Sequence, residues 1–271
     1  MSMEDRIALE VTDGIAHVRL IRADKMNALD AQMFDAIVEV GEKLRADPDV
    51  RVVVLSAEGR AFCAGLDTSN FAAMAGGDKG ETASNPLVTR THGIANKPQH
   101  AAWMWRELPV PVIAVVHGVA YGGGFQIALG ADMRYATADA RMSVMEIKWG
   151  LVPDLAGTQL MRNLAREDVV RELTYTGRVF NGEEALAMGF VTRVCDDPLA
   201  QAMETARDIA GRNPDAIRGD KRLLNDAPYL DREAGLLAES REQDAIIGTP
   251  NQVEAVMAEM EKRPAKYSKA S

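Results

Sequence analysis

Two glycine-rich segments place backbone N–H groups where they could bind a ligand oxygen. The first, Gly59–Asp67 (GRAFCAGLD), has only small side chains around Ala64. The second, Gly118–Phe125 (GVAYGGGF), puts three glycines between an expected strand and an expected helix. Glycine and small residues let a ligand approach the backbone, and free amides at a helix N-terminus point outward with the positive end of the helix dipole behind them. Together the segments could aim two donors at one oxygen, which a reaction that builds negative charge on a carbonyl requires.

Each segment is weak evidence when it is taken alone, because a glycine-rich turn is more often only a tight turn. The GGG run lacks the GxGxxG spacing of a dinucleotide site and the Lys-Ser/Thr pair of a P-loop. Cys63 stands next to Ala64, but no His-Asp partner is evident, so we interpret it as a small packing residue and not as a nucleophile.

Two acids, Glu146 and Asp154, follow the second segment in EIKWGLVPD. Two carboxyl groups beside a bound ligand can shuttle a proton, one removing it and the other returning it. Burial should separate their pKa values, because two close carboxylates resist joint ionisation. Simpler interpretations stay open: Asp154 could cap a helix that begins near Leu155, and Glu146 could be a surface residue at a strand end.

The composition excludes several classes of protein. The chain has 271 residues and a net charge of −9, which does not suit a general nucleic-acid binder. No apolar run reaches the roughly 18 residues of a membrane helix, and the N-terminus lacks the order of a signal peptide. Cys63 and Cys195 form neither a CxxC pair nor a metal-ligand spacing. We therefore expect a cytoplasmic protein with no metal and no nucleic-acid or membrane partner.

The elements that must position these residues alternate between strands and helices, so the expected fold class is α/β. Asp13-Gly14 is typical of a tight hairpin turn, and Pro109 and Pro111 should end a long helix. The polar, glycine-rich segment 75–86 is expected to be a mobile loop. Strands are expected at 7–11, 15–21, 50–56, 112–116, 133–136 and 140–144, and helices at 27–45, 87–108 and 125–131, with a mainly helical chain from 155 and almost only helix from 199.

Four motifs in one order carry a resemblance to a known family. Asn27-Ala28-Leu29, AFCAGLD, GVAYGGGFQIALGADMRYA and EIKWGLVPDLAGTQ resemble the crotonase superfamily, which includes enoyl-CoA hydratases and isomerases. The resemblance covers about residues 7–200. It implies a spiral of ββα units over residues 1–198 and a helical C-terminal oligomerisation region over residues 199–271, in trimers or dimers of trimers. It also implies an acyl-CoA thioester substrate, so that coenzyme A is part of the substrate and no separate cofactor is needed.

The resemblance further implies roles for individual residues. The two amides of an oxyanion hole fall on Ala64 and Gly123. Residues 64–67 would line the channel for the thioester and coenzyme A, and a basic residue at position 25 would lie near the CoA phosphates. The residues implied for binding are Lys25, Ala64, Gly65, Leu66, Asp67 and Gly123.

The acids decide which reaction the resemblance favours. Hydratases of the superfamily use two glutamates, whose positions are Gln126 and Glu146 here. A neutral amide cannot take a proton from water, and the loss of one acid–base partner typically costs about 10²–10⁴ in rate. Dienoyl-CoA isomerases of the superfamily have acids at the positions of Glu146 and Asp154, and also at that of Gln126. We therefore expect a bias towards double-bond isomerisation through an enolate, with Asp154 as the base near C2 and Glu146 as the acid.

Three alternatives remain at this point. Glu146 alone could hydrate a 2-enoyl-CoA while Gln126 holds the water. The chain could bind acyl-CoA without catalysis. Asp154 could be the nucleophile of a thioester hydrolase or dehalogenase, although the dehalogenase branch has a Trp at the position of Glu146.

Overall fold

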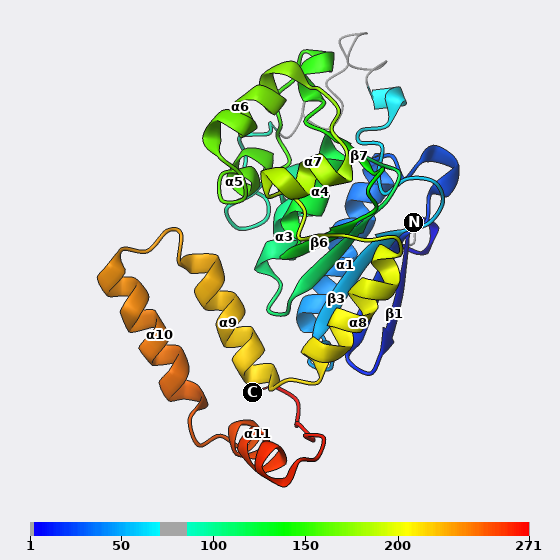
Figure 1. Cartoon of the computed structure of the whole chain (residues 1–271). Coiled ribbons are helices and arrows are strands. Elements are labelled where there is room, and N and C mark those ends of the chain that lie inside the picture. The colour runs from blue at the N-terminus through cyan, green and yellow to red at the C-terminus, as the bar shows by residue number, and fades with distance from the viewer. Residues whose placement is uncertain (1–2, 71–85, 271) are drawn as a thin grey trace.

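A six-stranded sheet forms the centre of the molecule (Figure 1). The computed structural model describes residues 3–70 and 86–270, so the expected loop 75–86 lies almost wholly outside the described residues. The first two strands are antiparallel and joined by a turn in which Asp13 and Gly14 have φ of 52° and 80°, and the other pairs are parallel. The strands, in sheet order, are β1 (Ile7–Thr12), β2 (Ile15–Leu20), β3 (Val52–Ala57), β4 (Val112–Val116), β6 (Met133–Ala136) and β8 (Arg193–Val194).

A second, two-stranded parallel sheet pairs β5 (Val119–Tyr121) with β7 (Arg141–Ser143). Only His117 and Gly118 separate β4 from β5, so the chain passes directly from the large sheet to the small one. The chain returns to the large sheet at β6 and leaves it again at β7. This repeated exchange between two sheets is the expected spiral.

Alternating residues on the strands face two different helical layers. Val53, Leu55 and Ala114 pack in the main core with α1 (Ala31–Ala46), α3 (Lys97–Glu107) and α4 (Gly123–Gly130). Their neighbours on the same strands pack against α8 (Pro198–Ala210) on the opposite face (Figure 1). Because successive side chains of a strand point to opposite faces, the continuous β-branched runs are explained by burial on both sides.

The helix expected over 87–108 is wrong at its N-terminal end. It begins at Lys97, and residues 86–96 form turns. Asn96 accepts a hydrogen bond from the Gln99 N–H, and the Gln99 side chain accepts one from the Asn96 N–H. This capping box satisfies two N–H groups that a longer helix would use internally, so it fixes the start of the helix.

The C-terminal region is helical, as expected, and one lysine anchors it to the core. Lys221 is buried and donates hydrogen bonds to the carbonyls of Trp105 (3.1 Å) and Val110 (2.8 Å) and to the Asp132 carboxylate (2.8 Å). Burial lowers the pKa of Lys221, and the Asp132 charge opposes this shift. The helices of this region, after α8, are α9 (Pro214–Asp226), α10 (Arg232–Ile246) and α11 (Pro250–Glu261). Three shorter helices precede α8: α5 (Gly157–Met161), α6 (Glu167–Thr176) and α7 (Gly182–Met188).

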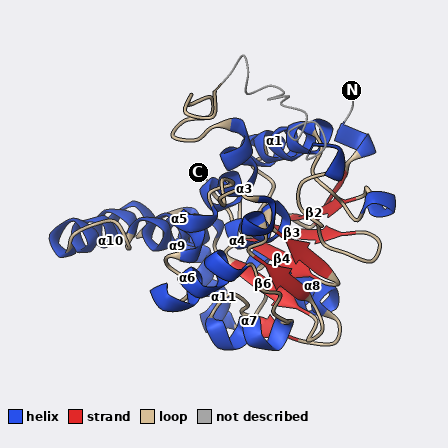
Figure 2. Ribbon diagram, turned by 90° about the horizontal axis from the view of Figure 1, so that it is seen from above, coloured by secondary structure: helices blue, strands red, loops and turns tan. Residues whose placement is uncertain are grey.

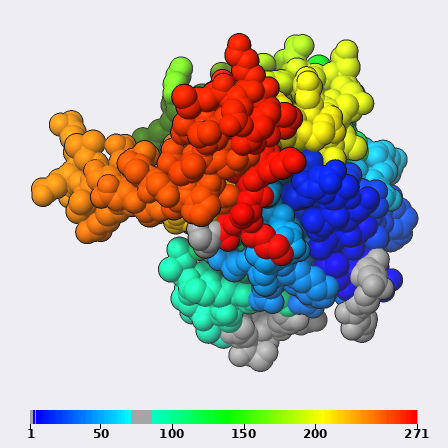
Figure 3. Space-filling view, turned by 90° about the horizontal axis from the view of Figure 1, so that it is seen from below, coloured from blue at the N-terminus to red at the C-terminus, as the bar shows by residue number. Residues whose placement is uncertain are grey.

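Helix α10 projects away from the sheet (Figures 2 and 3). It has no buried residue, and its Leu236 and Leu237 are 65% and 47% exposed. Within residues 3–70 and 86–270, none of the helices combines the length and apolarity that a bilayer crossing requires.

Helices α3 and α4 lie so close together that one added methyl group at their contact should lower the free energy of unfolding. A Cβ at Gly130 would lie 2.1 Å from the Ala102 carbonyl oxygen, whereas a Cβ at Gly235 on α10 would meet no atom within 4 Å. We expect Gly130→Ala to lower the free energy of unfolding by about 1–3 kcal/mol through overpacking. The control Gly235→Ala should raise it by about 0.5–1 kcal/mol, since Ala is favoured in a helix. Urea denaturation measures both, and equal effects would contradict this packing.

Candidate active site

One cavity of about 840 Å³ brings the two glycine-rich segments and the two acids together. Its walls are mainly apolar. Within the part of the chain that the structure describes, no cluster of three His, Cys, Asp or Glu side chains could hold a metal ion. Besides Lys25, the residues of the four motifs that line the cavity are Ala28, Leu29, Ala64, Gly65, Leu66, Asp67, Tyr121, Gly122, Gly123, Glu146, Trp149, Leu151, Val152, Asp154 and Leu155.

The free amide of the first segment is not the expected one. The Ala64 N–H donates to the Met26 carbonyl oxygen at 2.9 Å, so the assignment of Ala64 as a donor to a ligand is wrong. The Leu66 N–H has no acceptor among the described residues. The Gly65 carbonyl accepts from the Leu29 N–H at 2.8 Å. Because the C=O and N–H of one trans peptide point in opposite directions, this bond turns the Leu66 N–H away from Leu29.

The second free amide is at Gly123, as expected. Helix α4 begins there, and the Gly122 carbonyl accepts the Gln126 N–H at 3.0 Å inside the first turn. The same planar peptide therefore points the Gly123 N–H out of the helix N-terminus. No described acceptor takes it.

The two segments touch at Gly65. Cys63 and Ala120 form a parallel bridge, and the Tyr121 N–H donates to the Cys63 carbonyl at 3.0 Å. A Cβ at Gly65, where φ is +90°, would lie 2.7 Å from the Tyr121 oxygen and 3.8 Å from the Gly123 nitrogen. Only glycine allows this approach, and it brings the Leu66 and Gly123 amides to the same wall of the cavity.

Glu146 is buried at the start of a 3₁₀ helix, Glu146–Trp149, so the interpretation as a surface residue is wrong. The Gln126 amide Nε2 donates to Glu146 Oε1 at 2.6 Å. Glu146 Oε2 is buried and has no hydrogen-bond partner among the described residues. Burial raises the pKa of Glu146, and the Asp154 charge adds to the rise. The carboxyl therefore tends to keep its proton and has one oxygen free for a ligand.

Gln126 connects Glu146 to the segment that carries Asp154. Its Oε1 accepts the N–H groups of Leu155 at 2.9 Å and Gly157 at 2.8 Å, while its Nε2 binds Glu146. The side chain is buried, and its oxygen, which accepts two backbone N–H groups, has no capacity for another partner. The sequence indicated that Gln126 could orient a water or a carboxylate, but it did not indicate the bonds to Leu155 and Gly157. Its position three residues after Gly123, one helical turn on, is the only signal that places it beside the site.

Asp154 does not cap a helix. Helix α5 begins at Gly157 after Ala156, and no side chain caps it. Asp154 instead lines the cavity together with Glu146. Its side chain is accessible from the cavity, yet the surrounding protein removes enough water for burial to raise its pKa.

The other residues implied for binding are placed differently. Lys25 lines the cavity at the end of the 3₁₀ helix Ala23–Lys25. Asp67 also lines it, but both carboxylate oxygens are engaged, by Arg22 at 2.7 Å and by Ser69. Cys63 is fully buried, which raises the pKa of its thiol to about 12, so it is a packing residue.

A family model for enoyl-CoA hydratase/isomerase matches residues 10–270. The chain belongs to this family. It is therefore an enzyme of the enoyl-CoA hydratase/isomerase family, and the resemblance to the crotonase superfamily is confirmed.

Relatives include both a hydratase and an isomerase. Mitochondrial methylglutaconyl-CoA hydratase of Mus musculus is 30% identical over 265 residues, which are 95% of this chain and 81% of the relative. Mitochondrial Delta(3,5)-Delta(2,4)-dienoyl-CoA isomerase of Mus musculus is 31% identical over 256 residues, which are 93% of this chain and 78% of the relative. The crystal structure of an enoyl-CoA hydratase from Bacillus anthracis superposes with a TM-score of 0.86 at 28% identity and covers 97% of this chain and 98% of that one. The expected fold class is confirmed.

The raised pKa of Glu146 predicts a pH-dependent cost to stability. At a pH below its ordinary pKa the carboxyl is protonated in both the folded and the unfolded chain. As the pH rises through the raised pKa of the folded state, the folded protein loses stability, because ionisation is easier in the unfolded chain. Gln at this position keeps the acceptor for Gln126 and does not ionise. We therefore expect Glu146→Gln to be more stable than the wild type, by a margin that grows as the pH rises above the ordinary pKa of a glutamate.

Urea denaturation across this pH range measures the margin. The exposed Glu239 on α10 provides the control, and Glu239→Gln should show no comparable trend. A margin that shrinks as the pH rises would contradict a buried, readily protonated Glu146.

Proposed function

We propose that the chain moves a carbon–carbon double bond along an unsaturated acyl-CoA thioester, in the manner of a dienoyl-CoA isomerase. The observation that carries this proposal is the placement of Glu146 and Asp154 in one cavity with two unpaired backbone N–H groups. Gln126 supports it, because its amide occupies the place where a second glutamate would serve hydration.

The two amides of Leu66 and Gly123 would hold the thioester oxygen. Removal of a proton from C2 places negative charge on this oxygen, and preorganised N–H donors stabilise that charge more than the neutral carbonyl. The N-terminus of α4 adds the positive end of a helix dipole at Gly123. This pair replaces the pair Ala64 and Gly123 that the sequence implied.

The acids would divide the proton transfer between them. Asp154 takes the proton from C2, and the electron pair of the broken C–H bond enters the enolate. Glu146, whose pKa is raised by burial, gives a proton to a carbon farther along the chain as the enolate collapses. The double bond has then moved, the thioester is neutral again, and one proton passes between the two carboxyl groups to restore them.

Hydration by Glu146 alone is the second candidate, since one relative is named a hydratase. Hydration needs a group that takes a proton from water beside a second acid. The Gln126 Nε2 is a donor only and already binds Glu146, and its Oε1 accepts two backbone N–H groups. The hydrogen bonding of Gln126 therefore favours isomerisation.

The substrate preference tests this choice. We expect the wild type to convert a 3,5-dienoyl-CoA to the 2,4-dienoyl-CoA, seen as a rise in conjugated thioester absorbance, and to hydrate a 2-enoyl-CoA poorly. Glu146→Gln and Asp154→Asn should each lower the kcat of isomerisation by about 10²–10⁴-fold. Turnover of the 2-enoyl-CoA only, abolished by Glu146→Gln and not by Asp154→Asn, would overturn the proposal in favour of hydration.

Gln126→Glu is the matched variant for this assay. A carboxylate at position 126 keeps an acceptor for the Leu155 and Gly157 amides and adds a group that can activate water. We expect it to gain hydration of the 2-enoyl-CoA relative to isomerisation. CoA-ester binding by the wild type without turnover of either substrate would support a binding protein instead.

We also propose that the chain forms trimers or dimers of trimers through its C-terminal helices. The exposed apolar residues of these helices support this, among them Leu236 and Leu237 on α10 and Val256, Met257 and Met260 on α11. Light scattering should give three or six times the mass of the chain, and Leu236→Glu should shift it towards the monomer. Glu239→Gln on the same helix is the control, and a monomeric wild type would contradict the proposal.

A further inference from the structure

Two backbone hydrogen bonds hold the loop with Leu66 against the chain that precedes α1. The Leu29 N–H donates to the Gly65 carbonyl at 2.8 Å, and the Asp67 N–H donates to the Leu29 carbonyl at 3.0 Å. Leu66 therefore lies between two bonds to one residue. Backbone bonds at Cys63 and Ala64 fix the residues before Leu66, whereas the residues after it need an attachment of their own.

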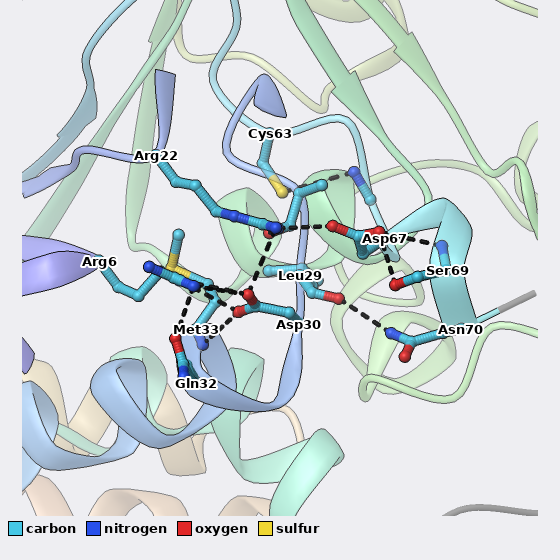
Figure 4. A network of polar contacts seen from close by, with 12 residues as sticks. Arg6, Arg22, Leu29, Asp30, Gln32, Met33, Cys63, Asp67, Ser69 and Asn70 are labelled. Atoms are coloured by element: carbon cyan, nitrogen blue, oxygen red, sulfur yellow. Dashed lines mark hydrogen bonds and ion pairs between the residues drawn. The ribbon is translucent and has the colours of Figure 1, made fainter. Parts of the chain in front are cut away.

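The Asp67 side chain provides this attachment (Figure 4). One of its oxygens accepts from Arg22 at 2.7 Å, and the other accepts from the Ser69 N–H and hydroxyl at 3.0 and 2.8 Å. Asp67 is buried, and these hydrogen bonds lower its pKa to about 2. The carboxylate is thus charged and fully engaged although it borders the cavity, so its partners are within the protein and not in the ligand.

Arg22 carries the attachment to the start of α1. The Nη1 that binds Asp67 also donates to the Ala28 carbonyl at 3.0 Å, and Nη2 lies 3.4 Å from the Asp30 carboxylate. Asp30 caps α1 by accepting the Met33 N–H at 2.8 Å. Figure 4 shows the guanidinium of Arg22 between the two carboxylates. The loop is consequently fixed to the helix that begins beside it.

We propose that Arg22 and Asp67 are positioning residues that set the direction of the Leu66 N–H. They thereby determine how strongly this N–H stabilises the enolate oxygen. This inference rests on the proposed function, in which that N–H binds the thioester oxygen. The Asp67 oxygens and the Arg22 Nη1 are engaged within the protein, so the pair acts through the loop. Loss of their ion pair lets the Gly65–Leu66 peptide tilt, and a displacement of about 1 Å at a reacting group can cost 10²-fold in rate.

Asp67→Asn and Arg22→Met test the pair. Asn keeps the size of the side chain and an acceptor for Ser69 but loses the charge. We expect each variant to lower the kcat of isomerisation by on the order of 10²-fold with a much smaller change in KM, because the N–H acts mainly in the transition state. Arg22→Lys retains a cation and should recover part of the loss. The double variant should lose no more than the single ones, since they break one interaction.

Arg6→Met is the matched control. Arg6 donates at 2.8 Å to Asp30 Oδ2, the same oxygen that lies 3.4 Å from Arg22, and among the described residues it makes no polar contact with Asp67. Its loss should lower the thermal midpoint without lowering kcat. If Arg6→Met reduces kcat as much as Asp67→Asn at a similar loss of stability, the role of the pair is general stability and the inference is overturned.

A spectroscopic measurement separates this inference from the proposed function. Acetoacetyl-CoA forms an enolate with its own ultraviolet absorbance, and donors at the thioester oxygen raise the enolate fraction of the bound molecule. We expect a clear enolate band with the wild type and with Arg6→Met, and a weaker one with Asp67→Asn at saturating ligand. An equal band in Asp67→Asn overturns the positioning role alone. No band with the wild type overturns the enolate site itself.

Discussion

The planar trans peptide is the constraint on which the site depends. A peptide whose carbonyl oxygen is engaged must point its N–H the other way, and the cavity contains two such peptides. Leu29 engages the Gly65 carbonyl, and Gln126 engages that of Gly122. Two N–H groups with no acceptor among the described residues, from segments almost sixty positions apart, are thereby directed into the cavity by backbone hydrogen bonds. The approach at Gly65, which only glycine permits, brings them to one wall.

Gln126 connects the Gly123 N–H to the two acids. It lies in the first turn of α4, so the same helix presents the Gly123 N–H and holds Glu146 by a 2.6 Å hydrogen bond. Its oxygen fixes the turn after Asp154 through two backbone amides. The helix is buried throughout and packs on α3, so the arrangement is set by the core. This arrangement buries Glu146, one of whose carboxyl oxygens has no hydrogen-bond partner among the described residues.

Most of the fold was predictable because the signals are local. The hairpin at Asp13-Gly14 and the buried β3 and β4 follow from neighbouring residues, and α4 begins at Gly123, two residues before the expected start. The start of α3 was missed, since the periodicity before Asn96 resembles a helix and the capping box decides against it. The alternative that Asp154 caps a helix is wrong, because the chain turns through Ala156, at φ of 62°, before α5 begins.

The sequence by itself determined the chemistry that is possible: two acids, a neutral amide at position 126 and glycines where a ligand must approach the backbone. It also determined the family, because four motifs keep one order along the chain. Only the tertiary structure decided which amide is free. Ala64 and Leu66 are only two positions apart. The Met26 carbonyl accepts the Ala64 N–H, whereas Leu29 binds the Gly65 carbonyl and so leaves the Leu66 N–H without an acceptor among the described residues. Hydrogen bonds between remote segments have no local pattern, so no reading of neighbouring residues could have assigned them.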